Sequence, residues 1–98
     1  MPVTLNARAS VPSGVIVSDL GDESVILNLE TERYFGLDSI GTKMWIAMTS
    51  SSSLRAACDS LLREYEVAQE TLENDLVTLA EKLLEQGLVE VVADGAPA

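Results

Sequence analysis

The stretch Arg33-Tyr34-Phe35-Gly36-Leu37-Asp38, which runs on to Trp45, decides the fold because the periodicity of the chain changes within it. Before it, apolar and polar residues alternate as in a β-strand; after it, apolar residues recur at helical spacing. Its aromatic and aliphatic residues predict a short strand over residues 33–37, with Phe35 and Leu37 facing the core. Asp38 can then cap a helix by accepting hydrogen bonds from free backbone N–H groups.

Two more strands are expected upstream, over residues 15–20 and 24–30, because both segments are rich in Val, Ile and Leu. The turn at residues 21–23 contains a glycine, which accepts positive φ. Residues 31–32 form a connection so short that it can only reverse the direction of the chain. The three segments therefore predict an antiparallel meander of three strands.

Alternation within residues 24–30 predicts which face of this sheet is buried. Val25, Leu27 and Leu29 fall on one face, whereas the other face is polar apart from Ile26. We expect the face with Val25, Leu27 and Leu29 to be the buried one.

Three helices are expected next, from about Ser39 to Met48, from Leu54 to about Tyr65, and from about Thr71 to Gln86, where Gly87 ends the last one. A short strand over residues 88–92 completes the chain. This order predicts an α+β fold: a small winged helix-turn-helix-like domain with a three-stranded antiparallel sheet, three helices and a short C-terminal strand.

Three residues of the first two helices predict close packing. Gly41 costs about 1 kcal/mol of helix propensity relative to alanine, so we expect another element to approach it closely. Trp45 is expected in the core, as a single tryptophan in a small helical domain usually is. Cys58 lies within an apolar stripe and should be a buried small hydrophobe rather than a reactive thiol.

The third helix has a wide apolar arc. Its main stripe holds Leu72, Leu76, Leu79 and Leu83, and a flanking stripe holds Val77, Ala80 and Leu84. Two interpretations stay open: the helix is buried on two sides, or part of the arc lines an open groove.

The chain of 98 residues has the length of one domain. We expect residues 1–13 to form an N-terminal arm or edge strand, residues 14–92 the folded domain, and residues 93–98 a flexible tail.

Charge and composition exclude several classes of function. Sixteen acidic residues against six basic ones give a net charge of −10, which repels nucleic acid and anionic membranes. No apolar run could span a bilayer and the N-terminus does not resemble a signal peptide, so we expect a cytoplasmic protein. With no histidine and Cys58 as the single cysteine, we expect no metal, no cofactor and no enzymatic activity.

Four stretches together carry a family resemblance: Tyr34-Phe35-Gly36-Leu37-Asp38 with Gly41 and Trp45, then Tyr65-Glu66-Val67, Asp75-Leu76, and Leu84-Glu85-Gln86-Gly87-Leu88-Val89. Over about residues 14–92 the chain resembles the PqqD-like family of leader-peptide-binding proteins, also called RiPP recognition elements. The first of these stretches looks most like the stand-alone recognition proteins of lasso-peptide biosynthesis.

The resemblance implies binding without catalysis. The leader segment of a ribosomally made precursor would add as an antiparallel strand to the strand at residues 33–37, between that strand and the third helix. The bound leader would present the precursor to a processing enzyme, in the lasso case a leader peptidase followed by a cyclase. Our hypothesis from the residues is likewise that this strand is a docking edge for a peptide.

Carried onto this sequence, the resemblance implies a peptide-binding site formed by the strand residues Arg33, Tyr34, Phe35, Gly36 and Leu37 and by the helix residues Asp75, Leu76, Leu79, Lys82 and Leu83. The helical wheel places Asp75 and Lys82 at the rim of the main stripe, where they could contact polar groups of a peptide. Leu76 and Leu83 fit the core equally well. Tyr34 opposes the core residues and could contact the partner enzyme or the N-terminal arm.

Three alternatives share the pattern. A winged-helix DNA-binding protein would need a basic third helix, but its exposed positions carry four acids and one lysine. An adaptor or homodimerisation module would also use an exposed strand edge and amphipathic helices. A PqqD-like chaperone for a radical enzyme is the third.

Overall fold

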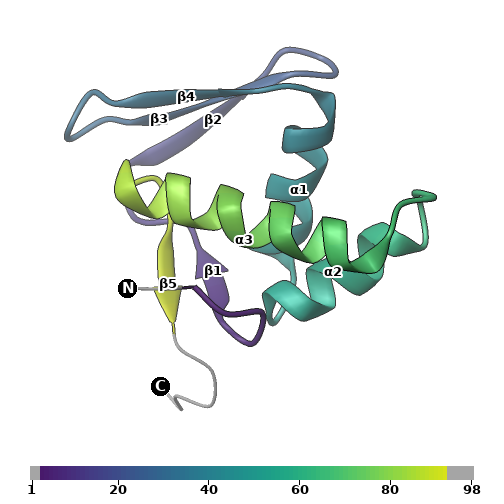
Figure 1. Ribbon diagram of the computed structural model, residues 1–98. Coiled ribbons are helices and arrows are strands. Elements are labelled where there is room, and N and C mark those ends of the chain that lie inside the picture. The colour runs from purple at the N-terminus through teal and green to yellow at the C-terminus, as the bar shows by residue number, and fades with distance from the viewer. Residues whose placement is uncertain (1–2, 93–98) are drawn as a thin grey trace.

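The computed structural model describes residues 3–92, so the tail expected at residues 93–98 lies outside the described residues. In chain order the elements are β1 (Arg8–Ser10), β2 (Val15–Asp19), β3 (Ser24–Asn28), β4 (Tyr34–Leu37), α1 (Ser39–Ser50), α2 (Leu54–Leu62), α3 (Gln69–Glu85) and β5 (Glu90–Val92). The predicted α+β fold, with a three-stranded antiparallel sheet, three helices and a short C-terminal strand, is confirmed. The helices lie on one side of this sheet (Figure 1).

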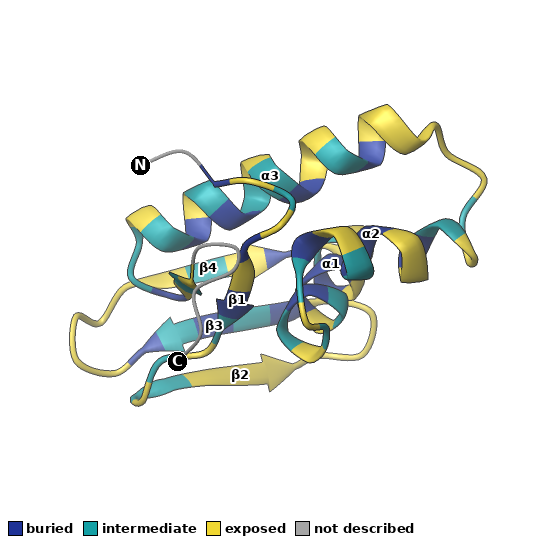
Figure 2. Cartoon of the chain, turned by 90° about the horizontal axis from the view of Figure 1, so that it is seen from below, coloured by how far each residue is buried: buried dark blue, intermediate teal, exposed yellow. Residues whose placement is uncertain are grey.

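The sheet has the order β2-β3-β4, with both pairs antiparallel, so β4 forms one of its edges. Ile26 of β3 is opposite Phe35 of β4, and Ser24 is opposite Leu37. These four residues therefore share the face that looks toward the helices. Helix α3 runs beside β4, while the largely exposed β2 lies at the far edge (Figure 2).

The prediction for the buried face of β3 is wrong. Ser24, Ile26 and Asn28 are buried, whereas Leu29 is 55% exposed. The two polar residues tolerate burial because each has a hydrogen-bond partner. The Ser24 hydroxyl lies 2.8 Å from the hydroxyl of Thr42 on α1, and the Asn28 amide binds the backbone beyond α3.

The N-terminal segment belongs to the core. Strand β1 pairs with β5 as a separate antiparallel sheet, on the side of α3 away from the other three strands (Figure 1). Ala7 and Ala9 are buried, as is Val3. The carbonyl oxygens of Leu5 and Ala7 also accept hydrogen bonds from the first backbone N–H groups of α2, which would otherwise lack partners.

Local signals set the start of α1 as the sequence predicts. The Asp38 carboxylate accepts a hydrogen bond of 2.7 Å from the Gly41 backbone N–H. A Cβ atom at Gly41 would lie 3.1 Å from a methyl group of Leu37 and 3.2 Å from the Asp38 carboxylate. The close approach expected at Gly41 is therefore present, and it comes from the residues that join β4 to α1.

Helix α3 ends in a Schellman motif. Gly87 adopts φ +71°, its N–H donates to the Leu84 carbonyl, and the N–H of Leu88 donates to the Leu83 carbonyl at 2.9 Å. This confirms Gly87 as the residue that ends the helix. The helix begins at Gln69, two residues before the expected start.

The core is aliphatic and forms where the helices meet β3 and the N-terminal segment. Trp45 and Cys58 are both buried in it, as predicted. Burial raises the pKa of the Cys58 thiol, and the nearby Glu73 and Asp59 carboxylates raise it further. Within residues 3–92, no helix has the length and apolar character that crossing a membrane requires.

Candidate functional site

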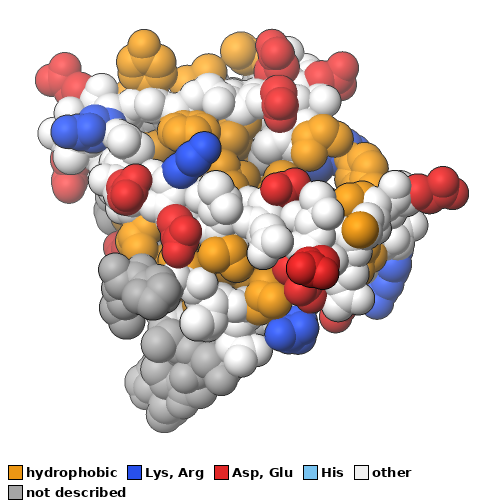
Figure 3. All heavy atoms as spheres, in the orientation of Figure 1, with side chains coloured by type: hydrophobic (Ala, Val, Ile, Leu, Met, Phe, Trp, Pro, Cys, Tyr) orange, Lys and Arg blue, Asp and Glu red, His pale blue; other side chains and the backbone are white. Residues whose placement is uncertain are grey.

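A groove of about 370 Å³ opens between the edge strand β4 and helix α3. Residues from β4, from the start of α1 and from α3 line this β4–α3 groove: Phe35, Gly36, Leu37, Asp38, Ile40, Gly41, Met44, Asp75, Thr78, Leu79 and Lys82. Hydrophobic side chains show at its floor between the sheet and α3 (Figure 3).

The strand side of the groove offers backbone groups. Within the described residues, β4 pairs only with β3, so its other edge faces the groove without a partner strand. Such an edge carries a row of N–H and C=O groups that an extended peptide can match. Gly36 adds no side chain, and a Cβ there would meet nothing within 4 Å.

The helix side of the groove combines one apolar residue with polar ones. Leu79 is half-buried and lines the groove, while Asp75, Thr78 and Lys82 are exposed along it. Leu76 and Leu83 have no exposed surface. The main leucine stripe of α3 is thus divided: Leu76 and Leu83 lie in the core, whereas Leu79 lies at the surface of the groove.

This places the ten predicted site residues in three groups. Six line the groove: Phe35, Gly36, Leu37, Asp75, Leu79 and Lys82. Arg33 and Tyr34 lie next to it along the chain but do not line it. Leu76 and Leu83 are packed in the core, so the expectation that their side chains flank a peptide does not fit their burial.

Helix α1 supplies lining residues that the sequence reasoning missed. Ile40 is 50% exposed and Met44 is buried, and both line the groove. The sequence did contain a signal for Ile40, because this residue is the first of the apolar stripe of α1. It lies in the first turn of the helix, where the stripe extends beyond the part that packs in the core.

Charge is unevenly distributed along the groove. β4 and α3 run in opposite directions (Figure 1), and the Arg33 guanidinium donates a hydrogen bond of 2.9 Å to Gln86 just beyond α3. Asp38 and Asp75 consequently lie toward the end of β4, while Lys82 and Arg33 lie toward its start. The groove is acidic at one end and basic at the other.

Comparison with known proteins is consistent with this geometry. A family model described as coenzyme PQQ synthesis protein D (PqqD) matches residues 23–89. No curated protein matches the chain significantly.

Two solved structures share the fold. One is described as TbiB1 in complex with the TbiA(beta) leader peptide; it has 32% sequence identity and a TM-score of 0.78, over 87% of this chain and 99% of that one. The other is described as lasso peptide synthetase B1 complexed with the leader peptide, with 20% identity and a TM-score of 0.75, over 85% of this chain and 98% of that one. Because the family model covers more than half of the chain, from β3 to the end of the helical region, this protein belongs to the PqqD family.

Proposed function

We propose that this protein binds the leader segment of a ribosomally made precursor peptide, as a non-catalytic recognition protein of lasso-peptide biosynthesis. The observation that carries the proposal is an unpaired strand edge, β4, beside a partly apolar groove. The solved relative at 32% identity, which is described as a leader-peptide complex, supports it.

The leader adds to β4 as an antiparallel strand. Backbone hydrogen bonds to residues 34–37 provide sequence-independent affinity, and apolar contacts with Leu79 and Ile40 provide selection. Because α3 is antiparallel to β4, the leader runs in the same direction as α3. Its N-terminal end then lies near Asp75 and its C-terminal end near Lys82.

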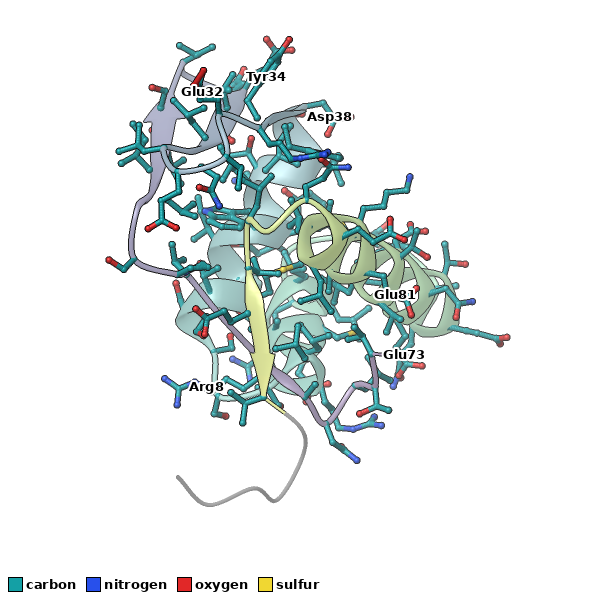
Figure 4. The ribbon with its side chains drawn as sticks, turned by 90° about the vertical axis from the view of Figure 1, so that its left-hand side faces the viewer. Arg8, Glu32, Tyr34, Asp38, Glu73 and Glu81 are labelled. Carbon is teal, nitrogen blue, oxygen red and sulfur yellow. The ribbon has the colours of Figure 1, made fainter. Side chains whose placement is uncertain are left out.

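We further propose that the protein delivers the bound leader to a leader peptidase, and the opposite face of the sheet supports this step. The pairing register puts Ile16, Leu27 and Tyr34 side by side on the face away from the helices. Tyr34 is 72% exposed, and it points away from the helices (Figure 4). An enzyme docked on this outer face would leave the β4–α3 groove free for the leader.

We place this step in the cytoplasm, where precursor peptides are synthesised. A chaperone for a radical enzyme would use the same groove with another partner. A homodimer would use the outer face or the edge of β4 for a second copy of the chain.

The test is a fluorescence-polarisation titration of the purified protein with the labelled leader segment of a lasso-type precursor, ideally one encoded beside this chain. A scrambled leader is the control. Saturable binding of the native leader, with none of the scrambled one, is the expected result. Failure of the matched leader to bind, together with a mass that rises with protein concentration, would favour the dimer instead.

A further inference from the structure

Two of the six basic residues of this acidic chain, Arg33 and Lys82, lie at the same end of the β4–α3 groove and are named here the basic pair. Gln86 connects them, because it accepts a hydrogen bond from Arg33 and follows Lys82 by four residues at the end of α3. Side chains at this spacing are neighbours on a helix surface. Figure 3 shows Lys and Arg side chains at this end, beside the boundary between the sheet and α3.

Neither member of the basic pair has a carboxylate at ion-pair distance among residues 3–92, where the ion pair formed is that of Arg55 with Glu73. The chain has sixteen acidic residues, yet the Arg33 guanidinium is bound by the neutral amide oxygen of Gln86, at 2.9 Å. An amide orients a guanidinium without cancelling its charge. The basic pair therefore keeps both positive charges available to a ligand.

Arg33 is held in place by its main chain as well as by its side chain. Its N–H donates to the Thr31 hydroxyl at 3.3 Å, and its carbonyl oxygen accepts from the Asn28 N–H at 2.8 Å. A guanidinium carries five N–H donors in a planar fork, so the single bond to Gln86 leaves donors for a carboxylate. The side chains of Arg33 and Lys82 are exposed, so a ligand can reach both.

We infer that the basic pair is an anion-binding subsite of the groove and selects an aspartate or glutamate of the leader, an inference that rests on the proposed function. A leader antiparallel to β4 leaves the groove at the start of that strand, next to Arg33. The selected acidic residue therefore lies on the C-terminal side of the segment that pairs with β4. Its carboxylate binds between the Arg33 fork and the Lys82 ammonium.

This contact fixes the register of the leader on β4. A slip of two residues along a strand keeps the same alternation of faces, and backbone hydrogen bonds do not distinguish the two registers. A carboxylate at the basic pair does distinguish them, because one register alone places it between the two cations. The subsite thereby also sets which residue of the precursor is the first beyond the end of the groove.

The experiment is a double-mutant cycle measured by fluorescence polarisation. The probes are the labelled leader segment of a lasso-type precursor, ideally one encoded beside this chain, and copies in which one Asp or Glu at a time becomes Asn or Gln. Amide hydrogen exchange of the bound leader locates its paired segment. The proteins are the wild type, Arg33→Gln and Gln86→Glu, the last of which gives Arg33 a carboxylate partner within the protein.

Two control variants make the same changes of charge at exposed positions that do not line the groove. Arg63→Gln removes one positive charge at the end of α2, and Asn74→Asp adds one negative charge on α3. They separate a local contact from the effect of net charge on the approach of the peptide. Circular dichroism verifies that each variant is folded.

We expect Arg33→Gln and Gln86→Glu each to weaken binding of the native leader about three- to tenfold, and both controls to bind it as the wild type does. One leader copy, with its amide on the C-terminal side of the paired segment, should bind the wild type equally weakly. Combining that copy with Arg33→Gln should cause little further loss, because both changes remove the same contact.

Three results would overturn the inference. The first is unchanged affinity of Arg33→Gln for the native leader. The second is that the loss caused by Arg33→Gln adds to the loss from every acidic substitution, or that the leader has no acidic residue beyond its paired segment. The third is coupling to an acidic residue on the N-terminal side of that segment. If the wild type binds the native leader no better than a scrambled one, the proposed function itself is wrong, whereas specific binding with any of these results removes only the anion-binding subsite.

Discussion

The side-chain amide of Asn28 donates a hydrogen bond of 2.8 Å to the backbone carbonyl of Gly87, 59 residues further along the chain. Its own carbonyl oxygen accepts from the backbone N–H groups of Glu30 and Thr31 at 2.9 and 3.1 Å. One buried side chain thus joins the β3–β4 turn to the end of α3. This link fixes the sheet to the end of α3 on the side where Lys82 and Arg33 lie.

Replacing Asn28 by alanine should destabilise the protein by about 1–3 kcal/mol, because alanine cannot replace the three hydrogen bonds that the buried Asn28 side chain makes with the Gly87 carbonyl and the N–H groups of Glu30 and Thr31. Urea unfolding followed by circular dichroism measures this change. The exposed Asn74→Ala, which deletes the same amide from the surface of α3, is the control and should unfold like the wild type. Equal stability of the two variants would contradict the proposed role of Asn28.

Leu79 and Leu83 belong to the same leucine stripe but should respond differently to substitution. Leu79→Asp should leave the circular-dichroism spectrum unchanged and weaken leader binding about tenfold or more, since Leu79 is half-buried in the groove. Leu83→Asp should unfold the protein, because it places a carboxylate at a position with no exposed surface. A folded Leu79→Asp variant that binds normally would remove Leu79 from the site.

Charge reversal at the two ends of the groove tests whether these charges contact the leader. Asp75→Lys and Lys82→Glu both alter exposed side chains and should leave the fold intact. Each should change leader affinity about two- to fivefold, an effect that added salt reduces because exposed charges are screened. Affinities that neither substitution alters at low salt would mean that these charges do not contact the peptide.

Tyr34 separates leader binding from enzyme docking. Tyr34→Ala should bind the leader as the wild type does, because the side chain points to the outer face and away from the groove. It should slow leader removal in a reaction reconstituted with a leader peptidase that cleaves the same precursor. An unchanged cleavage rate at limiting protein concentration would argue against docking on this face.

Cys58 provides a pH-dependent test of the core. Burial raises the pKa of its thiol in the folded protein, so on raising the pH the unfolded chain loses this proton first. The folded state is then penalised, and stability should fall above about pH 8.5, the usual pKa of a free thiol. Urea unfolding at a series of pH values measures the loss, which should be absent from Cys58→Ala. An equal loss of stability in the wild type and in Cys58→Ala would have to come from the titration of other side chains.

The sequence by itself determined the order and the ends of most elements, because these depend on neighbours along the chain. Asp38 and Ser53 cap α1 and α2 through hydrogen bonds three residues ahead. Gly87 ends α3 because the motif there requires positive φ. The burial of Cys58 also followed from helical periodicity, and that of Trp45 from the usual place of a single tryptophan in a small helical domain.

Only the tertiary structure decided which face of β3 is buried. A shift of one residue along a strand exchanges its two faces. The alternation of apolar and polar residues in β3 does not favour Ser24 and Asn28 for the core. Their burial depends on partners that are distant in sequence, Thr42 and Gly87. No local pattern specifies that such partners will be in place.

The division of α3 into core and groove was likewise a tertiary result. A wide apolar arc is compatible with burial on two sides or with an open surface, and the choice depends on what packs against each part. Leu76 and Leu83 are packed in the core, whereas Leu79 is only half-buried and lines the groove together with residues of β4. The sequence therefore predicted that β4 and α3 form the site. The packing of distant segments determined which of their side chains remain available to a peptide.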